Sequence, residues 1–302
     1  MTLIAVALAC AVPQRPLVEN ERPNIVLVLM EGEVPPTPIG VVALPLYAVV
    51  ERTGDPNGAL LTGQWLPSPQ SNSIAGVLSL YGYRTATTAA AESVRALGFL
   101  ETAGEGWVEA GPEPFFMTDG GSDAAGMLAR WQTTLYRAGL RPRTAVVFAW
   151  TDGWNHPGAL WWDGPRAPEL LSPGEMASTV DVLPTLLAVA RATIPTDAGG
   201  VDLGRPGAGS QAAYGIAADG AFVIRSDRHR LIVRTADPLP EACPADAVLS
   251  DADGSLVDET AARDALYVAL RAWRARQTAK SARDRLGADH FDRLNAAQGY
   301  WR

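Results

Sequence analysis

The stretch RPNIVLVLMEGE, residues 22–33, decides the fold of this chain. Its centre, Asn24–Met30, is a continuous apolar run rich in valine and isoleucine, and Glu31 follows it directly. Such a run is typical of a strand that is buried on both faces of a parallel sheet. A second run of the same kind, Thr144–Trp150, is expected to form an adjacent strand of that sheet.

Segments with helical character alternate with these apolar runs. One helix is expected to begin at Ser73 and to stop near Gly82, and a second to begin after Ser122 as its N-cap and to stop at Gly139. A third helix is expected from about Ser178. Strands that alternate with helices predict an α/β fold with a doubly wound, mostly parallel sheet.

The pattern changes after about residue 211. The segment AFVIRSDRHRLIVRT, residues 221–235, consists of two short alternating strands around a polar turn, which predicts a hairpin. A long helical segment with an Ala/Leu stripe follows at 258–286. We therefore expect an α/β domain over residues 22–211 and a small α+β C-terminal subdomain, a hairpin plus helices, over residues 212–302.

Composition excludes several classes of protein. The chain has 302 residues, of which 47% are hydrophobic and 19% charged, so it can bury a core. Its net charge of -8 and the lack of any basic run argue against nucleic-acid binding. No apolar run in the sequence is long enough to span a membrane. The two cysteines and three histidines argue against a Cys/His zinc site and against a disulfide scaffold.

The N-terminal segment MTLIAVALACAVPQRP has the shape of a secretory signal, because a short apolar run ends in small residues before Pro13. Residues 1–11 are therefore a candidate signal or lipoprotein segment. The letters ALAC resemble a bacterial lipobox, in which Cys10 would carry the lipid anchor. We expect an exported protein, periplasmic or lipid-anchored. The alternatives are a loose N-terminal strand or a mis-assigned start codon, and with either the protein would be cytoplasmic.

Several segments together resemble the sulfatase family of the alkaline-phosphatase superfamily. RPNIVLVLMEGE is similar to the family's first strand, R-P-N-I-V-L-(I/V)-L-x-D-D, and GALLTG resembles the end of its signature, C/S-x-P-x-R-A-A-L-L-T-G. Further segments follow in the family's order: SIAGVLSLYGYRTA, GLRPRTAVVFAWTDG, STVDVLPTLLAVA, VIRSDRHRLIV and NAAQGYW. The resemblance implies the family's α/β fold and, as the family activity, sulfate-ester hydrolysis.

The nucleophile implied by this resemblance is altered in the chain. Sulfatases use a cysteine or serine that is converted to formylglycine, and an arginine four residues later. Thr53 stands at the nucleophile position and Asn57 at the arginine position. Threonine cannot become formylglycine, although related superfamily members use a threonine nucleophile. A threonine hydroxyl still needs activation by a metal, because its own pKa is far too high.

The implied metal site is also depleted. The resemblance implies a divalent cation, usually calcium, which prefers roughly six to eight oxygen ligands. The family's first Asp-Asp pair falls on Glu31 and Gly32, and the later pair falls on Thr151 and Asp152. Glu31 and Asp152 remain as candidate ligands, with Glu33 as a third. These residues are expected to hold no cation, or to bind one weakly.

Four tryptophans flank the strand end where the metal site of the family would lie: Trp150, Trp154, Trp161 and Trp162. Aromatic rings beside a polar cleft suit stacking on sugars or contact with a partner. Alternatively, the rings fill a cavity from which charged ligands have been lost.

Two functional hypotheses follow. The first is a catalytically impaired pseudo-sulfatase that acts as a binding or accessory module, with a sulfated or other glycan or a protein as its partner. The second is a divergent metal-dependent hydrolase of sulfuric or phosphoric esters that uses Thr53, Glu31 and Asp152.

Overall fold

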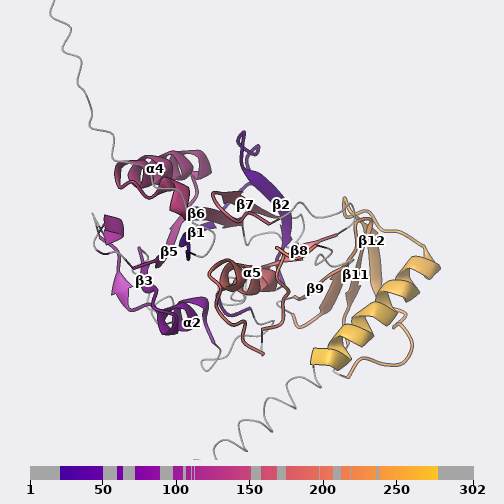
Figure 1. The fold of residues 1–302 in the computed structure, drawn as a ribbon. Helices are drawn as coiled ribbons and strands as arrows, with labels where there is room; N and C mark the ends of the chain where they lie inside the picture. The colour runs from indigo at the N-terminus through magenta and orange to yellow at the C-terminus, as the bar shows by residue number, and fades with distance from the viewer. Residues whose placement is uncertain are drawn as a thin grey trace, which may run out of the picture.

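The computed structural model describes thirteen stretches of the chain, which together contain two sheets and the helices beside them (Figure 1). The described residues are 21–49, 60–63, 72–88, 98–104, 107–109, 111, 113–150, 158–168, 175–196, 198–206, 212–217, 219–235 and 238–277.

The larger sheet has eight strands in the order β4-β3-β5-β1-β6-β7-β2-β8. Their bounds are β1 Asn24–Met30, β2 Val42–Tyr47, β3 Arg84–Thr87, β4 Glu101–Thr102, β5 Phe115–Gly121, β6 Thr144–Trp150, β7 Gly158–Asp163 and β8 Ala177–Ser178. Only β7 runs antiparallel to its two neighbours, and every other pairing in this sheet is parallel. The predicted mostly parallel sheet is therefore confirmed.

The two apolar runs that the sequence singled out are adjacent strands. β1 and β6 pair in parallel over their whole length, from Asn24 opposite Thr144 to Met30 opposite Trp150. At the start of the pair, the Asn24 amide nitrogen lies 3.3 Å from the Thr144 hydroxyl oxygen and donates to it. The predicted adjacency of these two segments in the sheet is therefore confirmed.

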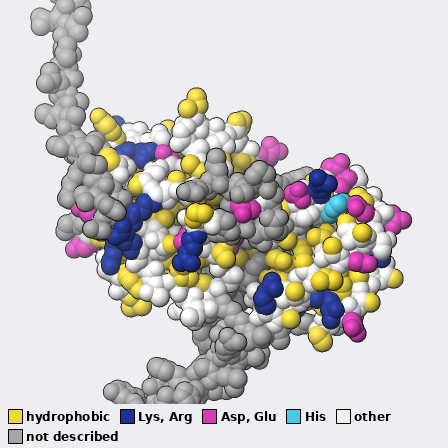
Figure 2. Space-filling view, turned by 45° about the vertical axis from the view of Figure 1, so that its right-hand side comes forward, with side chains coloured by type: hydrophobic (Ala, Val, Ile, Leu, Met, Phe, Trp, Pro, Cys, Tyr) yellow, Lys and Arg dark blue, Asp and Glu magenta, His cyan; other side chains and the backbone are white. Residues whose placement is uncertain are grey.

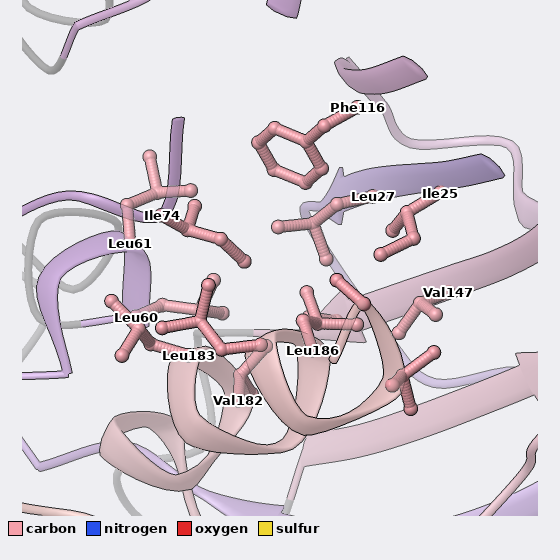
Figure 3. Close-up of a cluster of buried hydrophobic side chains, with 14 of the residues drawn as sticks. Ile25, Leu27, Leu60, Leu61, Ile74, Phe116, Val147, Val182, Leu183 and Leu186 are labelled. Carbon is pink, nitrogen blue, oxygen red and sulfur yellow. The ribbon is translucent and has the colours of Figure 1, made fainter. Parts of the chain in front are cut away.

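Helices cover both faces of the larger sheet. The α-helices are α2 Ile74–Leu80, α4 Ala124–Arg137 and α5 Val182–Val189, and the short 3-10 helices are η1 Trp107–Glu109, η2 Arg141–Arg143 and η3 Thr179–Asp181. α2 and α5 pack on one face, in a core that also contains alternate β1 side chains such as Leu27 (Figure 3). α4 packs on the other face against Val26 and Val28. This arrangement confirms the doubly wound fold.

The predicted start of α4 is wrong by one residue. Its N-cap is Asp123, whose carboxylate accepts the backbone N–H of Gly126 at 3.0 Å, and not Ser122. The carboxylate also lies beside the positive end of the helix dipole, which favours an anion over a hydroxyl. The other boundaries agree with the sequence: Ser73 caps α2 and Gly139 follows α4 with a φ of +72°.

The smaller sheet has four antiparallel strands in the order β12-β11-β10-β9. The strands are β9 Ala213–Ile216, β10 Phe222–Arg225, β11 His229–Val233 and β12 Val248–Asp251. β10 and β11 are the predicted hairpin. The described part of the following helix, residues 260–277, contributes Tyr267, Leu270 and Trp273 to the core of this sheet.

A backbone hydrogen bond joins the two sheets, because the N–H of Ile216 donates to the carbonyl of Val49 at 2.8 Å. On the face drawn in Figure 2, acidic and basic side chains are interspersed among apolar ones. Across the described stretches, no helix has both the length and the apolar character of a membrane span.

Candidate functional site

The carboxyl ends of seven of the eight strands lie at one edge of the larger sheet, since β4 is parallel to β3 and β8 is parallel to β2. β1, β3, β5 and β6 are parallel, and β2 points the same way because β7, antiparallel to both β6 and β2, lies between them. Open α/β sheets bind their ligands outside the carboxyl ends of their strands. β2, which precedes in the chain the segment that resembles the family's nucleophile signature, ends at this edge.

Glu31 lies at this edge. It is the residue after β1, and its backbone N–H donates to the carbonyl of Gly121, at the end of β5, at 3.1 Å. The residue is exposed. Gly32 follows with a φ of +86°, a conformation that side chains rarely adopt, although the space around it is open. An aspartate restored at Gly32 would therefore fit sterically but would strain the backbone.

Glu33, the third candidate ligand, follows Gly32 directly and is exposed. Four further positions of the predicted site lie outside the described residues: Thr53, Asn57, Thr151 and Asp152. Cys10 also lies outside them. The structure thus places Glu31 at the expected edge and leaves the roles of Thr53 and Asp152 as predictions.

The described side chains at this edge do not fit a calcium site. Glu31 and Glu33 are the two predicted ligands that the structure describes, both exposed, and Gly32 between them supplies no side-chain oxygen. The nearby carboxylate of Asp119, on β5, is occupied by four donors: Thr88, Gly120, Arg130 and Trp131. Within the described stretches, no three His, Cys, Asp or Glu side chains are grouped so that they would hold a metal ion.

The end of the nucleophile signature is a packing element. Leu60 and Leu61, in GALLTG, are each 1% exposed and join the core that contains Leu183 of α5 (Figure 3). Gly63 has a φ of +62°, and a Cβ added there would lie 3.2 Å from the Cβ of Leu183. Its carbonyl accepts the N–H of Gly199 at 2.6 Å. What this segment shares with the sulfatase signature therefore positions the chain against α5.

Asp181, in STVDVLPTLLAVA, also has a structural role. Its carboxylate accepts the backbone N–H of Ser178 at 2.7 Å and that of Val201 at 2.8 Å. The side chain thereby joins the start of α5 to a loop 20 residues later. Burial raises the pKa of Asp181 to about 6, although these two hydrogen bonds act in the opposite direction.

The third resembling segment, GYRTA, holds the start of β1. The hydroxyl of Tyr83 donates to the carbonyl of Pro23 at 3.0 Å, and burial raises the pKa of Tyr83. The guanidinium of Arg84 lies over the ring of Trp107, with 4.4 Å between its carbon and the ring centroid, and donates to the Trp107 carbonyl at 3.0 Å. These contacts give Tyr83 and Arg84 structural roles.

The tryptophans of β6 and β7 are core residues. Trp150, Trp161 and Trp162 are 1%, 1% and 2% exposed. Trp150 and Trp161 meet edge to face with their centroids 4.7 Å apart, whereas Trp162 packs on the opposite face of the sheet. At this burial these three rings are not available to stack on a sugar at the surface, whereas the filling of a cavity left by lost ligands stays a prediction. Trp154 lies outside the described residues.

The sequence analysis missed Asp119, a buried carboxylate near the carboxyl end of β5. Its side chain is 5% exposed and forms an ion pair with Arg130 of α4. A signal was present in PFFMTDGG, where an aspartate interrupts an apolar strand, and buried aspartates are rarely found without partners.

No protein-family model and no curated protein matches the chain. Solved structures match its fold at low identity. BT4656 in complex with its substrate D-glucosamine-2-N,6-O-disulfate has a TM-score of 0.62 and 13% identity over 87% of this chain and 99% of its own. The lipoteichoic acid synthase LtaP from Listeria monocytogenes has a TM-score of 0.56 and 11% identity over 86% and 91%.

A third similar structure is a protein in the alkaline phosphatase superfamily from Vibrio parahaemolyticus. It has a TM-score of 0.56 and 17% identity over 91% of this chain and 93% of its own. Identities this low establish the fold and leave the chemistry to the residues of the site.

Proposed function

Because the chain has the fold shared by sulfatases and other members of the alkaline-phosphatase superfamily, we propose that it is a pseudo-sulfatase. In this proposal it no longer hydrolyses esters and acts as a binding or accessory module. Its partner is a sulfated or other glycan, or a protein.

One observation carries this proposal: the segments that resemble the family retain residues with packing roles. Leu60, Leu61 and Gly63 pack on α5, Asp181 caps η3 and binds a loop, and Tyr83 anchors the start of β1. The positions to which the family assigns chemistry hold other residues, namely Thr53, Asn57, Gly32 and Thr151. The sequence therefore keeps the scaffold and changes the groups that would act on an ester.

The second hypothesis, a divergent metal-dependent hydrolase, keeps some support from Glu31. Its exposed carboxylate stands at the carboxyl end of β1, and its backbone is held by Gly121. With Asp152 and Thr53, it would form the reduced site of that hydrolase.

An activity assay separates the two hypotheses. Aryl sulfate and aryl phosphate are offered to the full chain with calcium, magnesium or manganese, and the Thr53→Ala variant is assayed in parallel. We expect no turnover above background from either protein. Turnover that disappears in Thr53→Ala would reject the pseudo-sulfatase and support the hydrolase.

A restoration series tests the proposed loss further. We expect Thr53→Cys alone to remain inactive, because it still lacks the arginine and the metal ligands, and catalytic groups that act as a unit are not additive. Partial activity should require Gly32→Asp and Thr151→Asp together with Thr53→Cys. Activity of Thr53→Cys alone would show that the metal site and the positive charge that the family's arginine supplies are both still provided, contrary to the proposal.

A further inference from the structure

A pocket of about 410 Å³ lies on the α4 side of the larger sheet, near the carboxyl ends of β3 and β5. Small-molecule sites typically measure about 300–1,000 Å³. Trp107, Val108, Met117 and Trp131 give the pocket an apolar wall that combines two indole rings, a thioether and an aliphatic side chain. Glu31, which the structure describes, is not among its lining residues.

The polar side of the pocket is built around the ion pair of Asp119 and Arg130. The Asp119 carboxylate accepts the Trp131 indole N–H at 3.0 Å, the Thr88 hydroxyl at 2.6 Å and the Gly120 backbone N–H at 2.9 Å. Arg130 supplies the fourth donor. With its lone pairs occupied in this way, Asp119 is a fixed anchor for Arg130 and is not an acceptor for a ligand.

Arg130 is the group that this pocket offers to a ligand. Its side chain is 56% exposed, and its guanidinium carbon lies 5.6 Å from the centroid of the Trp131 ring. A guanidinium has five N–H donors in a planar fork that matches an oxyanion. One of these donors bonds to Asp119, so the anchored fork keeps further donors at the pocket wall.

We propose that this pocket binds a small ring-bearing oxyanion. The ring lies against Trp107 and Trp131, and a sulfate, phosphate or carboxylate group on the ring accepts hydrogen bonds from Arg130. Thr134, half-buried on α4, lines the same pocket and offers a hydroxyl to the polar substituents of the ring. Charge complementarity selects the anion, and the indole wall selects the ring.

Calorimetric titration of the full chain tests this site. The two ring-bearing probes are N-acetylglucosamine 6-sulfate and phenyl phosphate, which distinguish a sugar from an aromatic source of the oxyanion. N-acetylglucosamine and inorganic sulfate supply the ring and the anion of the first probe separately, and phenol and inorganic phosphate supply those of the second. We expect at least one of the ring-bearing probes to bind at least about tenfold more tightly than either separate part. The proposal would be overturned if the separate parts bound as tightly as the ring-bearing probes. It would also be overturned if neither ring-bearing probe bound at millimolar concentration.

Two arginines of α4 provide a matched pair of variants. Arg130→Gln should weaken binding by about tenfold or more, whereas Arg137→Gln, which removes the same charge from an exposed position on the same helix, should change it by less than about twofold. Thr134→Phe, which adds bulk at the wall, should also weaken binding. Thermal unfolding of each variant confirms that it is folded.

The site is independent of the proposed function. Wild-type affinity in Arg130→Gln and Thr134→Phe would reject the pocket, even if the pseudo-sulfatase proposal holds.

Discussion

Gly63 shows how a single residue fixes the end of the nucleophile signature. Its φ of +62° lies in the left-handed region, and an added Cβ would lie 3.2 Å from the Cβ of Leu183. Any other residue there meets backbone strain and overpacking together.

We expect Gly63→Ala to lower the free energy of unfolding by about 2–4 kcal/mol, measured by urea denaturation. Gly40→Ala is the matched control, because Gly40 has a φ of +83° and nothing within 4 Å of an added Cβ. The control should lose only about 1 kcal/mol through backbone strain. Equal losses in the two variants would mean that the contact with Leu183 does not constrain position 63.

Asp181 makes the stability of the protein depend on pH. The pKa of its carboxyl group is about 6 in the folded protein, compared with the ordinary value of 3.8 that applies to the unfolded chain. Between about pH 4 and pH 6 the folded state therefore holds a proton that the unfolded state has lost. The stability that this proton contributes is fully present below pH 3.8 and is lost as the pH rises through 6.

Comparison with Asp181→Asn isolates this effect from the other titrating groups. We expect the variant to be less stable than the wild type at every pH, because an amide replaces one of two acceptors with a donor. The difference in unfolding free energy should be larger at pH 4.5 than at pH 7.5, by on the order of 2 kcal/mol. A difference that does not change with pH would show that Asp181 titrates at its ordinary pKa.

At the scale of the elements, α4 depends on the residue that caps it. We expect Asp123→Ala to lower the free energy of unfolding by about 1 kcal/mol, because the Gly126 N–H loses its acceptor and the helix dipole loses an anion. Ser122→Ala should change it by less than about 0.5 kcal/mol. Chemical denaturation of both variants measures the two effects, and the reverse order would restore Ser122 as the cap.

Several strands could not be predicted from local patterns. β2 contains Pro45, which argues against a central strand. The proline is tolerated because β8 pairs with β2 only at Leu46 and Tyr47, so at Pro45 the described partner of β2 is β7 alone. β7 itself is an apolar run that reads equally well as parallel or antiparallel, and its direction follows from the strands on either side.

At the scale of the whole molecule, the packing segments resemble those of sulfatases, whereas the residues at the positions of the predicted site differ from theirs. The segments that resemble sulfatases form the two faces of the sheet and the contacts that hold α2 and α5. Because packing depends on size and shape, these segments can persist after the chemical groups have changed. A likeness in fold therefore says nothing by itself about whether the reaction of the family is kept.

The proposed export of the whole molecule rests on residues 1–11, which lie outside the described residues. If Cys10 carries a lipid, Cys10→Ala should move the protein from the membrane fraction to soluble or uncleaved material. Cell fractionation and intact mass measure this change. An unchanged distribution and mass would remove the lipid anchor from the proposal.

The sequence by itself determined the strands and boundaries whose signals are local. The apolar runs of β1 and β6, the cap of α2 at Ser73 and the β10–β11 hairpin were all predicted, because strand burial, helix capping and turn formation depend on residues close in the chain. The site predicted from the sequence, at Glu31 and Thr53, stays a prediction, and of these two residues the structure describes only Glu31.

Only the tertiary structure decided the contacts between distant residues. It placed antiparallel β7 between β6 and β2, bound Asp181 to Val201, and enclosed Asp119 among Thr88, Arg130 and Trp131. Each of these arrangements depends on which elements pack together, and several packings can satisfy the same local pattern. The pocket beside Arg130 could therefore not be predicted from the sequence, because it forms where β5 and α4 pack together.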